Sequence, residues 1–264
     1  MARRLADRGV RQRLIVRDPA RAPELAGAEV VGPAAYHERE AMTAALTGAR
    51  TLCLVSATEA PDRVSLHTTT VDAALDAGVE RIVYVSFLGA APDATFTFAR
   101  DHWSTEEHIR AAGVRFTFLR NSQYLDFVPR LAGPDGVIRG PAGDGRCAWV
   151  ARDDSADVAV EVLAGEGHDG QTYDLTGPEA RTLAEAAELL SQATGRTIVY
   201  VPETIEEAYE SRASFGAPRY EVDGWVTSYL AIATGEMDVV SDAVERIAGH
   251  RPQTIADFLG VRAA

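Results

Sequence analysis

The sequence predicts an α/β fold in which a doubly wound, mostly parallel sheet is joined to a small, mainly helical C-terminal lobe. Through the first half of the chain, short and nearly continuous apolar runs alternate with longer amphipathic stretches, which is typical of parallel strands buried on both faces. The pattern changes after Asn121, and most of the remaining chain is helical with breaks at glycine and proline. We expect residues 1–122 and 153–178 to form the sheet domain, and residues 123–152 and 179–264 to form the lobe.

The first half supplies strands and helices in alternation. The expected strands are Arg13–Arg17, Ala28–Val31, Thr51–Val55, Arg81–Ser86 and Arg115–Leu119. The expected helices are Ala2–Arg8, Tyr36–Gly48, Pro61–Gly78 and Arg100–Gly113. In the third of these helices, the apolar face is expected to consist of Val64, Val71, Ala74 and Leu75.

The second half is less regular. Gly136–Arg139 and Arg146–Val150 flank the sequence PAGDG, which predicts a hairpin or a loop turn. The further expected elements are helices Asp153–Gly165 and Thr182–Gly195, strands Gln171–Leu175 and Thr197–Val201, and interrupted helix from Glu203 to Phe258. Asp153 or Asp154 is expected to cap the first of these helices.

The first strand of the sheet is expected to be missing. The chain begins with a helix that leads into strand Arg13–Arg17, an order that belongs to the first helix and second strand of a dinucleotide-binding sheet. One strand and its glycine-rich turn, about 10–15 residues, would precede it, so we expect a late start codon or a truncation. Without that strand, Arg13–Arg17 and Thr51–Val55 would either pair directly or leave buried backbone groups unpaired. The glycines at 140, 143 and 145 lead into a strand, and we expect them to form a surface turn rather than a phosphate loop.

Composition excludes several kinds of chemistry. All 26 basic residues are arginine, so no lysine can form a Schiff base, hold a P-loop phosphate or assist a tyrosine in a Tyr-x-x-x-Lys pair. A net charge of −13 argues against nucleic acid as a partner. The two cysteines give no metal or disulfide pattern, and no apolar run reaches the roughly 18 residues of a membrane span. We expect a cytoplasmic protein without a metal, acting on a small molecule, with a homodimer as one option for its assembly.

Arg17 is the first candidate for cofactor binding. It ends a strand in the sequence VRDPAR, where dinucleotide-binding sheets place either an acid for the ribose of NAD or an arginine for the 2′-phosphate of NADP. The alternative is a solvent-exposed arginine at a helix entry. Ser56, Ala57 and Thr58 follow the next buried strand, and Ser86 and Phe87 follow the one after it. Ligands bind at these carboxyl ends of strands, although serine and threonine also serve there as ordinary helix caps.

Three further residues are candidates for the reacting end of the ligand. His102 could donate a proton, or it could be a packing histidine; His108 lies six residues away and does not share its helix face. Asn121, the only asparagine, could hold the carboxamide of a nicotinamide ring or could form a turn. Tyr124 and Phe127, with Phe87, Phe96 and Phe98, could line an aromatic pocket or belong to the core.

The order of these motifs resembles a known family. VRDPAR, the run from LCLVSATEA to VERIVYVSFLGA, the segment LRNSQY and the strand QTYDLTG stand in the order found in NmrA-like atypical short-chain dehydrogenases/reductases. Within that family the chain is most similar to bacterial NAD(P)H:quinone oxidoreductases of the second type. The resemblance covers the chain from Ala2 to about Phe258, and it departs from the family at the missing N-terminal glycine motif.

The resemblance implies a Rossmann-type domain that binds NADPH, closed by a C-terminal lobe. It implies that Arg17 meets the 2′-phosphate, that Ser56 and Ser86 line the cofactor cleft, and that Asn121 and Tyr124 lie near the nicotinamide. The expected activity is hydride transfer from NADPH to a quinone or similar conjugated electrophile, with His102 or water completing protonation and Tyr124 as a second candidate. The alternatives are a non-catalytic sensor of NADP(H) and a truncated copy with impaired cofactor binding.

Overall fold

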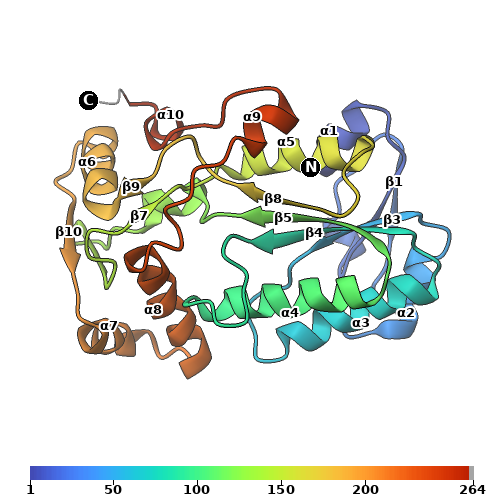
Figure 1. The fold of residues 1–264 in the computed structure, drawn as a ribbon, viewed down its shortest axis with the longest axis horizontal. Coiled ribbons are helices and arrows are strands. Elements are labelled where there is room, and N and C mark those ends of the chain that lie inside the picture. Colours follow the sequence, from blue (N-terminus) through green and yellow to red (C-terminus); the bar gives the residue numbers. More distant parts are fainter. Residues whose placement is uncertain (262–264) are drawn as a thin grey trace. The chain divides into compact units, whose positions relative to one another are not determined.

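The computed structural model describes residues 1–261 and is drawn as a ribbon in Figure 1. The strands are β1 (Gln12–Ile15), β2 (Ala28–Val31), β3 (Thr51–Val55), β4 (Arg81–Phe87), β5 (Arg115–Asn121), β6 (Val137–Gly140), β7 (Arg146–Cys147), β8 (Gln171–Leu175), β9 (Arg181–Thr182) and β10 (Val199–Pro202). The α-helices are α1 (Ala2–Asp7), α2 (Arg39–Leu46), α3 (Arg63–Asp76), α4 (Thr97–Ala111), α5 (Arg152–Ala164), α6 (Leu183–Thr194), α7 (Ile205–Arg212), α8 (Arg219–Ala233), α9 (Ala243–Ala248) and α10 (Ile255–Leu259). Three 3-10 turns complete the set: η1 (Pro19–Arg21), η2 (Leu125–Arg130) and η3 (Ala213–Phe215).

The chain divides into two compact units. The first unit contains Met1–Ser86, Asp101–Leu119 and Ala156–Tyr173, and the second contains Phe87–Arg100, Arg120–Ser155 and Asp174–Ala264. Each unit therefore draws on several separate stretches of sequence. The segment 87–100 was predicted to belong to the sheet domain, and it lies with the second unit.

The first unit is built on a four-stranded sheet with the order β3-β4-β5-β8. β3 and β4 run parallel, with Thr51 opposite Arg81 and Val55 opposite Val85. Helices α3 and α4 lie on one face of this sheet and α5 on the other, as Figure 1 shows. The prediction of a doubly wound, Rossmann-type α/β fold is confirmed, and the strand bounds 51–55 and 171–175 agree with the expected ones.

A second, smaller parallel sheet in this unit joins β1 to β2, with Gln12 opposite Ala28. Within residues 1–261, β1 and β3 belong to different sheets. β1 and β3 therefore do not pair directly; direct pairing was one of the two outcomes expected in the absence of a preceding strand. Val55, at the end of β3, is 49% exposed, which is unusual for a valine in the strand of a doubly wound sheet.

The core of the first unit packs α2 and α3 against the sheet. Its buried apolar residues include Leu46, Leu54, Val71, Ile82 and Phe118. The buried face of α3 is more polar than expected, because it contains Arg63, His67 and Thr70 besides valine and alanine. Val71 and Ala74 are buried as predicted, whereas Val64 and Leu75 are only half-buried.

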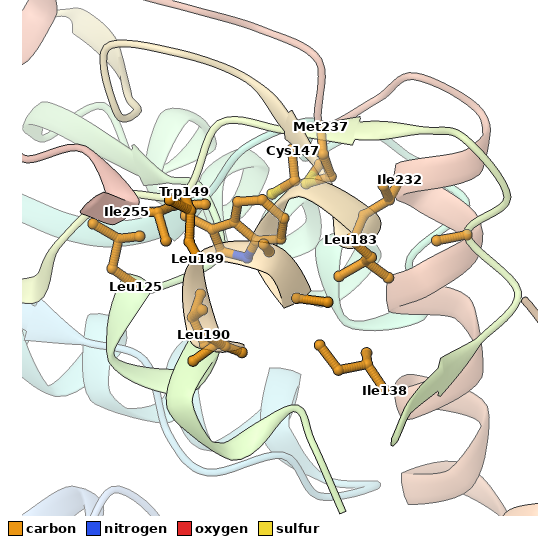
Figure 2. Close-up of a cluster of buried hydrophobic side chains, with 14 of the residues drawn as sticks. Leu125, Ile138, Cys147, Trp149, Leu183, Leu189, Leu190, Ile232, Met237 and Ile255 are labelled. Atoms are coloured by element: carbon orange, nitrogen blue, oxygen red, sulfur yellow. The ribbon is translucent and has the colours of Figure 1, made fainter. Parts of the chain in front are cut away.

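The core of the second unit surrounds Trp149, and Figure 2 shows it as a close-up. Leucines 183, 189 and 190 of α6 pack here. Thr182 caps α6 and forms a reciprocal capping box with Glu185, and Gly195 ends the helix in the left-handed conformation. Local sequence therefore determines both ends of α6.

Of the hairpin and the loop turn expected between β6 and β7, the structure has the loop turn, at residues 141–144. β6 pairs in parallel with β10, and β7 pairs antiparallel with β9. The glycines at 140, 143 and 145 lie in or beside this turn, and two of them also serve packing, because a Cβ on Gly140 would lie 2.4 Å from the Tyr229 ring and one on Gly145 would lie 2.2 Å from the carbonyl oxygen of Ile232. Both glycines therefore allow α8 to pack closely. Neither Asp153 nor Asp154 caps α5, since both lie within its first turn.

Candidate functional site

The carboxyl end of β1 presents two exposed arginines. Asp18 follows the strand, and its side chain accepts a 3.1 Å hydrogen bond from the backbone N–H of Ala20, which caps the turn η1. Arg17 precedes this turn and Arg21 ends it, and both are exposed. In the described part of the chain, no carboxylate pairs with either guanidinium. Two unpaired guanidiniums close together in sequence suit a phosphate ester, because arginine can donate two parallel hydrogen bonds to its oxygens.

The segment Val55–Thr58, which we call the β3 exit, is held by side chains from other elements. Tyr36 donates a 2.7 Å hydrogen bond from its hydroxyl to the carbonyl oxygen of Val55. His67 accepts one of 2.8 Å at Nε2 from the backbone N–H of Ala57. Arg63 donates one of 2.9 Å from Nε to the carbonyl oxygen of the same Ala57. Three backbone polar groups of the β3 exit are therefore fixed before any ligand binds.

The hydrogen bond to Ala57 determines the protonation of His67. A backbone N–H can only donate, so Nε2 carries no proton and the ring is neutral with its proton on Nδ1. Nδ1 lies 2.9 Å from the hydroxyl oxygen of Thr105, which in turn donates to the carbonyl oxygen of Asp101. Burial, and secondarily the charge of Arg63, lowers the pKa of His67 to about 3. His67 is therefore a permanently neutral acceptor at physiological pH.

His102, the predicted proton donor, belongs to the same buried network. Its Nε2 lies 3.0 Å from Nη2 of Arg63, and its Nδ1 lies 2.9 Å from the hydroxyl of Tyr84. Because a guanidinium only donates, Nε2 accepts and the imidazole proton is on Nδ1, directed to Tyr84. Burial raises the pKa of Tyr84, which keeps its hydroxyl protonated. His102 is 5% exposed, and both of its nitrogens contact protein groups.

The hydroxyl of Ser86 also forms a hydrogen bond within the first unit. It donates a 2.6 Å hydrogen bond to Oε1 of Glu106, whose other oxygen accepts from Arg110 at 3.1 Å. Ser86 and Glu106 are both buried. The structure therefore places Ser86 at the carboxyl end of β4, as expected, with its side chain bound to α4.

In the second unit, the residues after β5 form a compact hydrogen-bonded group. Asn121 is 2% exposed; its amide nitrogen donates to the hydroxyl of Tyr124 at 3.1 Å, and its amide oxygen accepts from the hydroxyl of Ser155. Burial raises the pKa of Tyr124, so its hydroxyl stays protonated at neutral pH. The guanidinium of Arg152 lies 5.0 Å from the Tyr124 ring centre and 4.9 Å from that of Phe127. We call Asn121, Tyr124 and Ser155 the β5 exit group.

The other predicted aromatic residues contact one another. The Phe87 and Phe96 rings lie 5.0 Å apart, and Phe96 meets Phe98 edge-on at 5.6 Å. Phe87 and Phe96 pack against the core around Trp149. These contacts agree with the alternative in which the phenylalanines belong to the core.

Sequence reasoning missed Arg63 and His67. They lie four residues apart, so they share a face of α3 with the buried Val71 and Ala74. A charged residue and a histidine at core positions of a helix were the available signal, because such groups are buried only when they are hydrogen-bonded.

Comparison with known proteins identifies the family. Residues 1–166 match the model of the NAD(P)H-binding family. The chain belongs to this family.

Its relatives include characterised enzymes. It is 33% identical to the NAD(P)H azoreductase of Xenophilus azovorans, over 95% of this chain and 88% of the relative. It is 34% identical to quinone oxidoreductase 2 of Escherichia coli strain K12, over 92% of this chain and 86% of the relative. The structure of the Escherichia coli NADPH-dependent quinone oxidoreductase complexed with NADPH superposes with a TM-score of 0.86 at 31% identity, covering 94% of this chain and 89% of that one. The family resemblance stated above is confirmed, and the protein is an NAD(P)H-dependent oxidoreductase.

Residues 1–261 contain neither a membrane-spanning helix nor a cluster of metal ligands. No helix there is both long and apolar enough to cross a membrane. The same residues contain no group of three or more histidine, cysteine or carboxylate side chains placed to hold a metal ion.

Proposed function

We propose that this protein prefers NADPH over NADH and transfers its hydride to a quinone or similar conjugated electrophile. The observation that carries the cofactor preference is the pair of exposed arginines, Arg17 and Arg21, which have no carboxylate partner in the described chain. An acidic selector for the ribose hydroxyl would repel a 2′-phosphate, whereas guanidinium attracts it. The names of the two relatives, an azoreductase and a quinone oxidoreductase, support a conjugated acceptor.

The donor set fits this cofactor. Arg17 and Arg21 would hold the 2′-phosphate, and the β3 exit, with Ser56 and Thr58, would line the dinucleotide. Ser86 and Phe87, at the carboxyl end of β4, would also line the same cofactor. NADPH supplies the hydride when bound. A lysine-free chain suits this reaction, because the charge that develops on a quinone spreads into its ring, and orientation then matters more than a strong acid.

Asn121, Tyr124 and His102 are assigned to the nicotinamide and substrate end. Tyr124 keeps its proton at neutral pH and can donate a hydrogen bond to an acceptor oxygen. Asn121 fixes the position of that hydroxyl. His102 stays a candidate for proton transfer, and its Nδ1 proton would have to leave Tyr84 to reach a substrate. Water is the other proton source.

The test compares NADPH and NADH oxidation with a panel of benzoquinones and azo compounds. We expect turnover with both cofactors and a lower KM for NADPH. Arg17→Ala should raise the KM for NADPH about tenfold or more and leave the KM for NADH unchanged, because only NADPH carries the 2′-phosphate. Arg11→Ala is the matched control, since Arg11 is equally exposed at the opposite end of β1. An equal effect on both cofactors, or no turnover by the wild type, would contradict the proposal.

A further inference from the structure

The Ala57 peptide unit is the point where the buried network of the first unit meets the main chain. Both of its polar groups are bound by side chains of one helix: the N–H by His67 and the carbonyl by Arg63, at 2.8 and 2.9 Å. His67 is fully buried and Arg63 is 3% exposed. Two polar side chains at core positions of α3 thus converge on the loop that leads into the same helix.

In the hydrogen bonds made by His67 and Arg63, the donor and the acceptor can be assigned. Thr105 donates to the backbone and so accepts the Nδ1 proton of His67, which leaves Nε2 free to accept from Ala57. Arg63 is held in turn by His102, and its Nη1 lies 3.8 Å from a carboxylate oxygen of Asp101. Nε2 of His67 and Nε2 of His102 therefore both accept, and both imidazole protons lie on Nδ1.

Packing alone does not account for these residues. Burying an imidazole and a guanidinium costs free energy that apolar side chains of similar volume would not incur. The Ala57 groups could also bond to water, because Ala57 is only half-buried and its neighbour Thr58 is exposed. What the two side chains add is a fixed conformation of the β3 exit.

We propose that His67, together with Arg63, is a positioning residue for the cofactor: it fixes the Ala57 peptide so that the β3 exit meets the dinucleotide in a preset conformation. This inference rests on the proposed function, in which the β3 exit lines the dinucleotide. A preset loop binds its ligand more tightly because less conformational freedom is lost on binding. His67 touches neither cofactor nor substrate in this role.

Two conservative variants separate the two contacts of His67. The amide of glutamine reaches about as far as Nε2, so His67→Gln can still accept the Ala57 N–H. The amide of asparagine reaches about as far as Nδ1, so His67→Asn keeps the contact to Thr105 and loses the one to Ala57. Both variants remove the imidazole from the same buried position, which makes each the control for the other.

The readouts are NADP⁺ affinity by fluorescence or calorimetric titration, KM and kcat for NADPH, and hydrogen exchange of the Ala57 amide. For His67→Asn we expect about tenfold weaker affinity, a KM raised to match, kcat within about twofold, and faster exchange at Ala57. His67→Gln should restore affinity and protection at Ala57. Thr105→Val should lower the melting temperature with less effect on affinity, because Ala57 stays bound.

Equal loss of affinity in the two His67 variants, or faster exchange at Ala57 with unchanged affinity, would overturn the positioning role. A failure of the proposed function would give a different experimental result from a failure of the positioning role. If the wild type binds NADP⁺ but reduces no quinone or azo compound, the acceptor class is wrong, and the affinity comparison still decides the role of His67.

Discussion

The β3 exit and the β5 exit group are both held by hydrogen bonds from buried polar side chains, yet they are stabilised in different ways. At the β3 exit, side chains of α3 and of the loop before α2 bind the backbone, and the side chains of Ser56 and Thr58 are not needed for this. In the β5 exit group, side chains bind one another: Asn121 joins Tyr124 to Ser155. Substitutions should therefore act through main-chain conformation in the first region and through lost side-chain partners in the second.

The largest effect is expected in the β5 exit group. Asn121→Leu keeps the size of the side chain but leaves the hydroxyls of Tyr124 and Ser155 without their amide partner. Since an unsatisfied buried polar group costs about 1–3 kcal/mol, the free energy of unfolding should fall by about 2–4 kcal/mol. Urea denaturation followed by circular dichroism measures it. Ser155→Ala removes one hydroxyl, whereas Asn121→Leu leaves two without a partner, so Ser155→Ala should lower the free energy of unfolding less. A larger decrease for Ser155→Ala would show that Asn121 is not the centre of the group.

The β3 exit should respond to pH, whereas the β5 exit group should not. An unfolded histidine has a pKa of about 6.5, while folded His67 takes up a proton only near pH 3, so the unfolded chain binds the extra proton in between. The contribution of His67 is therefore fully present above about pH 6.5 and is lost toward pH 3, by up to about 1.4 kcal/mol per pH unit. The charged and titratable groups around it are Arg63, Tyr36, Tyr84 and His102.

The comparison is made by urea denaturation at about pH 7, 6 and 5. His67→Gln should flatten the decline in stability, because glutamine does not titrate. Asn121→Leu should shift the whole curve downward without changing its slope. Parallel curves for the wild type and His67→Gln would mean that other groups produce the acid sensitivity.

The smallest effect is expected from Arg152, at the edge of the β5 exit group. Its guanidinium lies over the rings of Tyr124 and Phe127 but is exposed, and such contacts contribute about 0.5–1 kcal/mol. Arg152→Ala should lower the free energy of unfolding by that amount. Arg152→Lys should recover part of it, because lysine keeps the charge but not the flat stacking surface. A loss above about 2 kcal/mol would show that Arg152 is part of the group's support.

The two regions also differ in how much of them could be predicted. Apolar runs determined the strands Thr51–Val55 and Gln171–Leu175, because a parallel strand buried on both faces has a local signature. Asn121 and Tyr124 could be predicted as site residues from local sequence, because they lie at or just after the end of a strand. Their partner Ser155 lies 34 residues beyond Asn121, and nothing in the local pattern connects the two.

Long-range partners explain the remaining errors. The predicted apolar face of α3 is buried at Val71 and Ala74 but not at Val64 and Leu75. The structure instead buries His67, whose partners come from α4 and the β3 exit. β6 and β10 pair across about sixty residues of sequence, so the local turn pattern could not decide between a hairpin and the loop turn that forms. Periodicity shows which residues could be buried, and only the tertiary contacts decide whether a polar one finds a partner there.

The division of the chain also has a consequence for its synthesis. All segments of the first unit have been made once Tyr173 is added, whereas the second unit begins at Phe87 and still needs α10, which packs against α6. On the ribosome, the first unit can therefore fold while the segments 87–100 and 120–155 wait for their partners. During that interval Trp149 and Leu125, which are buried in the finished core, lack the later part of that core, including Leu183 and Ile255. The second unit is thus the part of a nascent chain most in need of a chaperone.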